Sequence, residues 1–116
     1  MSAKSGRNAE IKRLDKIWSK AVVERDGHRC RYCGNNGNQP HHIFTRRHRS
    51  TRWDLDNGIT LCWHHHFHLA HGEPEMFREF LMKEIGEKQF EILKRRAWSR
   101  AGKTDVALIE LSLKYA

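Results

Sequence analysis

Residues 40–71 read PHHIFTRRHRSTRWDLDNGITLCWHHHFHLAH, and they hold eight of the nine histidines of the chain. The ninth, His28, stands just before a second segment rich in ligand side chains, Cys30-Arg31-Tyr32-Cys33-Gly34. Side chains that titrate near neutral pH or bind metal ions are therefore concentrated in the middle of the chain. This pattern predicts a functional site there, supported by the segments on either side.

The length and composition predict one small domain. The chain has 116 residues, 38% of them hydrophobic and 31% charged, so its hydrophobic core is small. A core of this kind usually needs additional crosslinks, such as disulfides or a bound metal. The three cysteines cannot all pair with one another. No apolar segment approaches the length of a membrane span or a signal-peptide core. We therefore expect a cytoplasmic protein, with no membrane partner, whose Cys and His side chains bind metal.

The charge of the chain favours a polyanionic partner. The formal net charge is +8 and the sequence pI is about 9.8. Nucleic acid is the partner that such a charge most often indicates, while an acidic membrane would require an amphipathic anchor that the sequence does not offer. A basic surface that is only solvated is the alternative.

Two short motifs have the spacing of metal half-sites. The two residues between Cys30 and Cys33 let one tight turn direct both sulfurs to a single ion, and Gly34 permits the backbone conformation that follows. A redox motif has the same spacing but requires a βαβ context that is absent here. Cys62 and His65 repeat the spacing. The four side chains predict a closed structural site for Zn²⁺.

Hydrophobic spacing predicts the remaining elements. Ile11, Leu14 and Trp18 lie on one face of a helix over 8–26, which ends near Gly27 and has only a supporting role. Trp18 is expected in the core, as are Trp53 and Trp63. Strands are predicted at 41–44 and 59–61, a basic loop at 45–52, a turn at 54–58, and helices from 64, from 74 to 85 and around 90–97. The segment 104–115 fits either a helix or a strand.

Together, Cys30-x-x-Cys33, His41-His42-Ile43, Asn57 and Leu61-Cys62-x-x-His65-His66 resemble the HNH endonucleases of the ββα-metal class. The resemblance covers about residues 18–75, and the helices beyond are similar to those of small phage and mobile-element members. It implies an α+β fold, in which a ββα hairpin-plus-helix core with paired zinc knuckles occupies about residues 28–72 of a single domain, 1–116. Helices at 8–26 and 74–115 would flank this core.

Two positions depart from the common family pattern. His65 stands where the second knuckle usually has Cys, and it is still a good zinc ligand. His41 stands where many members carry Asp. Replacing an oxygen ligand with imidazole shifts the preference of the catalytic site from Mg²⁺ toward Mn²⁺, Ni²⁺ or Zn²⁺.

Neighbouring residues on a strand point to opposite faces, so His41 and His42 must do different work. The resemblance makes His42 the general base, and it makes His41 and His66 ligands of the catalytic metal. His71 is a third candidate, as a ligand, a phosphate contact or a surface residue. Asn57 matches the motif asparagine and is expected to hold the loop and orient His42, although in some relatives it is itself a ligand.

The basic loop beside the first strand predicts phosphate contacts, with a solvated loop as the alternative. Its candidates are Arg46, Arg47, His48, Arg49 and Arg52. The resemblance then implies a DNA endonuclease that nicks as a monomer or cuts both strands as a homodimer. A zinc module that binds DNA without cutting it, or a nuclease for RNA or branched DNA, would share most of these features.

Overall fold

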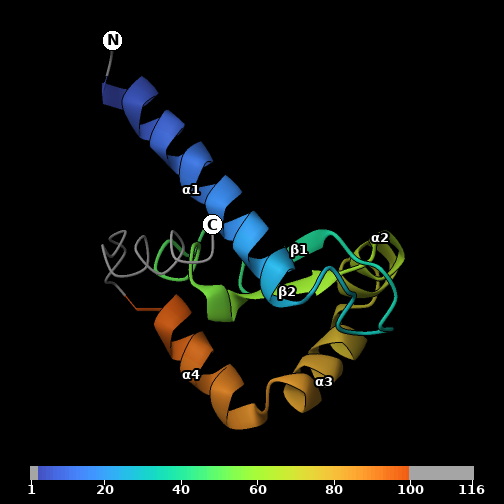
Figure 1. The fold of residues 1–116 in the computed structure, drawn as a ribbon. Coiled ribbons are helices and arrows are strands. Elements are labelled where there is room, and N and C mark those ends of the chain that lie inside the picture. The colour runs from blue at the N-terminus through green and yellow to red at the C-terminus, as the bar shows by residue number, and fades with distance from the viewer. Residues whose placement is uncertain (1–2, 100–116) are drawn as a thin grey trace.

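The computed structural model describes residues 3–99, which form an α+β arrangement of an N-terminal helix, a β-hairpin and further helices. The predicted segment 104–115 lies outside these residues. The elements are α1 (Ala3–Arg25), β1 (Gln39–His42), the 3₁₀ turn η1 (Leu55–Asn57), β2 (Gly58–Leu61), α2 (Trp63–His65), the π-helical turn η2 (His66–Ala70), α3 (Pro74–Glu84) and α4 (Glu87–Ala97). In Figure 1 the end of α1 lies beside the hairpin, and α3 and α4 form a V on its other side.

The hairpin has its two strands antiparallel, with His41 opposite Ile59 and His42 opposite Gly58. The first strand was predicted at 41–44 and instead ends at His42. The physical reason is Asn57, whose side chain binds both backbone groups of Phe44 and so ends the strand pairing there. The predicted order of strand, loop, strand and helix is confirmed.

Each face of β2 packs against a different hydrophobic cluster. Ile59 and Leu61 belong to the cluster formed with η2, α3 and α4. Gly58 and Thr60 point the other way, toward α1, as the two-residue period of a strand requires. A Cβ atom on Gly58 would lie 2.7 Å from the ring of Trp18 and 2.5 Å from a methyl group of Val22. The absence of a side chain at Gly58 therefore lets α1 lie directly on the hairpin.

The cluster under α1 confirms part of the predicted core. Leu14, Trp18 and Trp53 are buried in it. Trp63, which was also predicted to be buried, is 63% exposed. The prediction was wrong because Cys62 and His65 direct their side chains into the ligand cluster, which leaves Trp63 on the outer side of the single turn α2. In the described range 3–99, no helix has the length and apolar character of a membrane span.

A buried carboxylate joins α1 to the rest of the fold. The side chain of Asp26 is 3% exposed and lies 3.0 Å from Arg25 and 2.9 Å from Arg31. It also accepts a hydrogen bond of 2.9 Å from the amide of Thr60 in β2. Arg31 continues the network to Glu84 at the end of α3. Burial acts to raise the pKa of Asp26, but the bonds from Arg25 and Thr60 more than offset this, and its pKa is lowered.

We expect Asp26→Asn to destabilise the fold by about 1–3 kcal/mol, because it leaves two guanidinium groups without their shared partner. A lowered folded-state pKa means that the contribution of Asp26 is complete above the ordinary carboxyl pKa of about 4 and is lost in more acidic solution. Denaturant unfolding of wild type and variant should therefore differ at neutral pH and converge in acid. Glu10→Gln, at an exposed i,i+3 pair with Arg13, is the control and should change the free energy of unfolding little. Equal stability of both variants at neutral pH would contradict this role of Asp26.

Candidate functional site

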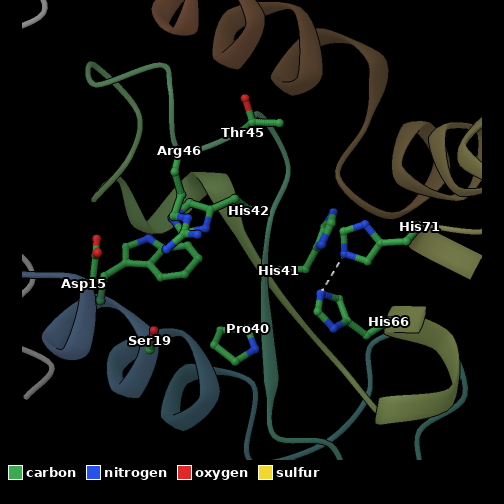
Figure 2. A pocket seen from close by; sticks show the side chains of 10 residues that line it. Asp15, Ser19, Pro40, His41, His42, Thr45, Arg46, His66 and His71 are labelled. Carbon is green, nitrogen blue, oxygen red and sulfur yellow. Dashed lines mark hydrogen bonds between the residues drawn. The ribbon is translucent and has the colours of Figure 1, made fainter. Parts of the chain in front are cut away.

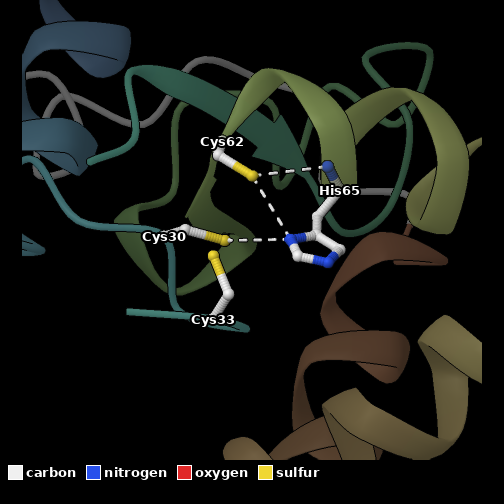
Figure 3. Close-up of side chains that lie close together, drawn as sticks. All are labelled: Cys30, Cys33, Cys62 and His65. Atoms are coloured by element: carbon white, nitrogen blue, oxygen red, sulfur yellow. Dashed lines mark hydrogen bonds between the residues drawn. The ribbon is translucent and has the colours of Figure 1, made fainter. Parts of the chain in front are cut away.

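Four side chains converge beside the hairpin and could hold a metal ion such as zinc. Their ligand atoms all lie within 4.8 Å of one another, and Figure 3 shows them directed toward a common point. Nδ1 of His65 lies 3.2 Å from Sγ of Cys62 and 3.8 Å from Sγ of Cys30. Ligands of a tetrahedral zinc ion are separated by roughly 3.5 Å, given its usual bond lengths. The donors therefore fit a zinc ion. We call Cys30, Cys33, Cys62 and His65 the Cys₃His cluster.

Local backbone geometry places the cysteines as the spacing predicted. The amide of Gly34 donates to the carbonyl of Cys30 over 2.8 Å, and Gly34 adopts a φ of 78° that favours glycine. Burial acts to raise the pKa of the Cys30 thiol, but backbone hydrogen bonds from Cys33 and Cys62 more than offset it and lower the pKa. Cys62 is also the N-cap of α2, where its sulfur accepts from the amide of His65. The turn thus favours the thiolate of Cys30, the form that binds metal.

We expect His65→Ala to abolish metal binding and unfold the hairpin, because metal binding contributes on the order of 10 kcal/mol to folding in small zinc domains. The neighbouring and exposed His64 offers a matched control, and His64→Ala should keep both metal and fold. Metal content per chain and the thermal unfolding profile measure the two outcomes. A metal-free His65→Ala protein that stays folded would refute the structural role of the Cys₃His cluster.

A second cluster consists of His41, His66 and His71, which we call the histidine triad. Its ligand nitrogens lie within 4.8 Å of one another, and Nε2 of His66 is 3.2 Å from Nε2 of His71 (Figure 2). The ring centroid of His41 lies 5.2 Å from that of His66 and 5.3 Å from that of His71. The structure thus brings together the two predicted ligands and the third candidate.

The π-helical turn η2 explains why His71 belongs to this group. Residues five apart on an α-helix are rotated by about 140°, which places them on different faces. In η2 the amide of His71 bonds to the carbonyl of His66, five residues earlier, and this wider turn returns both side chains to one face. Gly72 follows, where a Cβ atom would collide with the carbonyl oxygen of His68.

The triad is electrostatically suited to a cation. Burial, followed by the charges of His66, His71 and His42, lowers the pKa of His41 to about 3. Burial and then His71 also lower the pKa of His66. Crowded imidazoles resist protonation because each added proton repels the others. Neutral imidazoles are good ligands for transition-metal ions, so the triad could hold one.

His42 lies on the opposite side of β1 from His41, as Figure 2 shows. Two contacts hold its ring in place. Its ring stacks on Trp18, with centroids 3.8 Å apart and planes 9° from parallel. Its Nε2 lies 2.9 Å from the carbonyl oxygen of Arg52. A carbonyl can only accept, so Nε2 carries the proton and Nδ1 keeps its lone pair. Burial also lowers the pKa of His42, which favours the neutral ring.

Asp15 fixes the residue that holds His42. Its carboxylate accepts hydrogen bonds from Nε of Arg52 at 3.0 Å, from the Arg52 Nη2 at 2.7 Å and from Nε1 of Trp53 at 2.8 Å. Burial acts to raise the pKa of Asp15, but these bonds more than offset it and lower the pKa. Only a supporting role was predicted for α1, whereas in the structure α1 supplies both Asp15 and Trp18 to this site.

The side chain of Asn57 is fully buried and hydrogen-bonds to the backbone of the loop. Its Oδ1 accepts from the amide of Phe44 over 2.8 Å. Its Nδ2 donates to the carbonyls of Phe44 at 2.9 Å and Thr51 at 3.1 Å. This geometry matches the expected role of holding the loop beside His42. It leaves the alternative role of metal ligand without support, because the amide oxygen is already engaged at this buried position.

The five candidates of the basic loop differ in their surroundings. Arg46, Arg47 and Arg49 are exposed, and Arg46 lines the cleft described below. His48 is half-buried, with its ring 4.4 Å from that of Trp98. Arg52 is paired with Asp15, and its side chain is 18% exposed. Exposure leaves the first three available to a phosphate, while Arg52 already has a carboxylate partner.

One open cleft of about 370 Å³ joins the two sides of β1. Both His42 and the histidine triad line it, together with Asp15, Trp18, Ser19, Pro40, Thr45 and Arg46. A molecule in the cleft could therefore meet His42 and an ion on the triad at once.

No family model, curated protein or solved structure matches this chain.

Proposed function

We propose that the protein is a metal-dependent endonuclease of the HNH, or ββα-metal, class that hydrolyses phosphodiester bonds in DNA. The observation that carries the proposal is the shared cleft, which has an oriented neutral imidazole on one side of β1 and three convergent imidazoles on the other. The motif resemblance and the net charge of +8 support the same conclusion.

The proposed role of His42 is that of general base. Phosphodiester hydrolysis requires removal of a proton from the attacking water, and Nδ1 of His42 can accept it. The Arg52 carbonyl keeps the ring in the required tautomer and then stabilises the proton on Nε2. Trp18 prevents the ring from turning away from the cleft. Asp15 holds Arg52 in place from behind.

The proposed role of the histidine triad is to hold the catalytic divalent ion. When bound, such an ion supplies stabilisation of the negative charge that develops on the phosphoryl group and on the leaving oxygen. Three imidazoles favour Mn²⁺, Ni²⁺ or Zn²⁺ over Mg²⁺. Arg46, at the rim of the cleft, is placed to contact a phosphate of the same strand. The Cys₃His cluster takes a structural zinc ion and keeps the ends of the hairpin together.

A zinc module that binds DNA without cutting it is the second candidate. Such a module needs neither an imidazole whose tautomer is fixed nor a separate cluster of three convergent imidazoles in the same cleft. These two features favour catalysis. Whether one copy nicks DNA or a homodimer cuts both strands depends on how the copies associate, and the same cleft would also serve RNA or branched DNA.

We expect His42→Ala to lower cleavage by about 10²- to 10⁴-fold, the usual contribution of a positioned general base. Metal content and DNA affinity should not change, because the substitution removes no proposed metal ligand and no positive charge. Nicking of a supercoiled plasmid with added Mn²⁺ or Mg²⁺ measures the effect. The exposed His68 provides the control, and His68→Ala should cleave normally. Near-normal cleavage by His42→Ala would remove this histidine from the mechanism, and a wild-type protein without metal-dependent nicking would favour the binding module.

Arg52 should behave differently from the exposed arginines of its loop. Arg46→Ala and Arg49→Ala should weaken binding to all DNA sequences alike, and each should reduce the log-log salt slope by about 0.9 if one phosphate contact is lost. Arg52→Ala should chiefly lower the cleavage rate at saturating DNA, because it breaks the link from Asp15 to the support of His42. Binding titrations over a range of salt, combined with single-turnover cleavage, separate the effects. A slope change in Arg52→Ala as large as that in Arg46→Ala would identify Arg52 as a phosphate contact.

A further inference from the structure

The catalytic cleft continues into a groove along one side of the molecule. The cleft shares Ser19 and Pro40 with a neighbouring depression of about 480 Å³. Figure 2 shows both residues among the side chains that line the cleft. That depression shares His28 and Asn38 with a third one of about 380 Å³, which reaches Trp63. Because each depression shares lining residues with the next, the three form one groove from the catalytic histidines to α2.

Charged side chains of both signs line this groove, with a positive balance. One wall is a stripe of α1 at positions 16, 19, 20, 23 and 24, which includes Lys16, Lys20 and the opposing charge of Glu24. The other wall comes from the segment before β1, where Asn36 and Asn38 offer amide side chains. With Arg46 and Asp15 of the cleft included, three cations face two carboxylates along the groove, and this positive balance suits a chain of phosphates.

An exposed aromatic pair closes the far end. The ring of Trp63 stacks on that of Phe67, with centroids 5.6 Å apart and planes 6° from parallel. The two residues are 63% and 58% exposed. Phe67 supports one face of the indole, so the indole presents a fixed flat surface of about the size of a nucleobase. A positive groove that ends on an aromatic platform is the usual design for binding a single strand, because an unpaired base can stack on the ring. Bases inside a duplex are already stacked on each other.

We propose that this groove binds a single-stranded arm of the nucleic-acid substrate, with its phosphates along α1 and one base stacked on Trp63. The inference rests on the proposed nuclease function, since the groove opens into the catalytic cleft. It gives that function a substrate class, namely nucleic acid in which a single strand leaves a duplex near the scissile bond.

The test is Trp63→Ala measured by binding rather than by cleavage. Zinc-loaded protein carrying His42→Ala in every arm is titrated with labelled single strands, blunt duplexes, and duplexes that carry a single-stranded arm. Loss of one stacked base corresponds to about 5- to 150-fold in affinity. We expect that loss for the single strand and the armed duplex, and no change for the blunt duplex. Trp63→Tyr should restore most of the affinity, because a phenol ring also stacks.

Matched variants make the outcome decisive. Ile92→Ala removes an exposed apolar side chain of α4, away from the groove, and should change no affinity. Lys16→Ala should reduce the log-log salt slope for the single strand by about 0.7 if it contacts one phosphate. Unchanged single-strand affinity in Trp63→Ala, or an equal loss for the blunt duplex, would overturn the proposal and leave Trp63 and Phe67 as a surface for a protein partner. Failure of the nuclease proposal gives a different pattern: Trp63-dependent binding by a wild-type protein that never cleaves.

Discussion

The pairing of β1 with β2 is the constraint on which the site depends. It sets His42 opposite Gly58 and His41 opposite Ile59, so one imidazole faces α1 and the next faces η2. A slip of one residue in this pairing would exchange the two faces. His41 would then meet the indole of Trp18, and His42 would enter the ligand group. Gly58 has no side chain, so α1 can pack closely on β2 when Gly58 faces it. This packing therefore favours the observed register.

The two ligand clusters use neighbouring parts of the chain around the hairpin and the turns that follow it. The Cys₃His cluster joins the turn before β1 to the cap of α2. It therefore holds together the start of β1 and the end of β2, at the open end of the hairpin. The histidine triad uses β1 and the turn that follows α2. His65 and His66 are adjacent, and they serve different clusters. A shift of the backbone at this point would therefore disturb both groups together.

Local spacing made part of this arrangement predictable. Each half-site of the Cys₃His cluster follows from a local spacing of two intervening residues, and the two faces of β1 follow from the period of a strand. The membership of His71 depends on a π-helical turn, which α-helical spacing does not predict. Asp15 and Trp18 enter the site through packing between residues more than 20 positions apart, so the sequence showed only an ordinary amphipathic helix. Hydrophobicity alone predicts a core position for Trp63, but Cys62 and His65 turn into the ligand cluster and leave Trp63 on the outer side of α2.

The turn η2 also bears on how such a site can change during evolution. Two histidines four residues apart meet on an ordinary α-helix, whereas His66 and His71 are separated by one residue more and meet because the backbone hydrogen bond also spans five residues. A turn of this kind has room for one residue more than an α-helical turn, and a new helix begins beyond it at Pro74. The number of residues between two ligands can therefore vary in a lineage while the imidazoles stay together. Searches that require a fixed ligand spacing would miss sites of this kind.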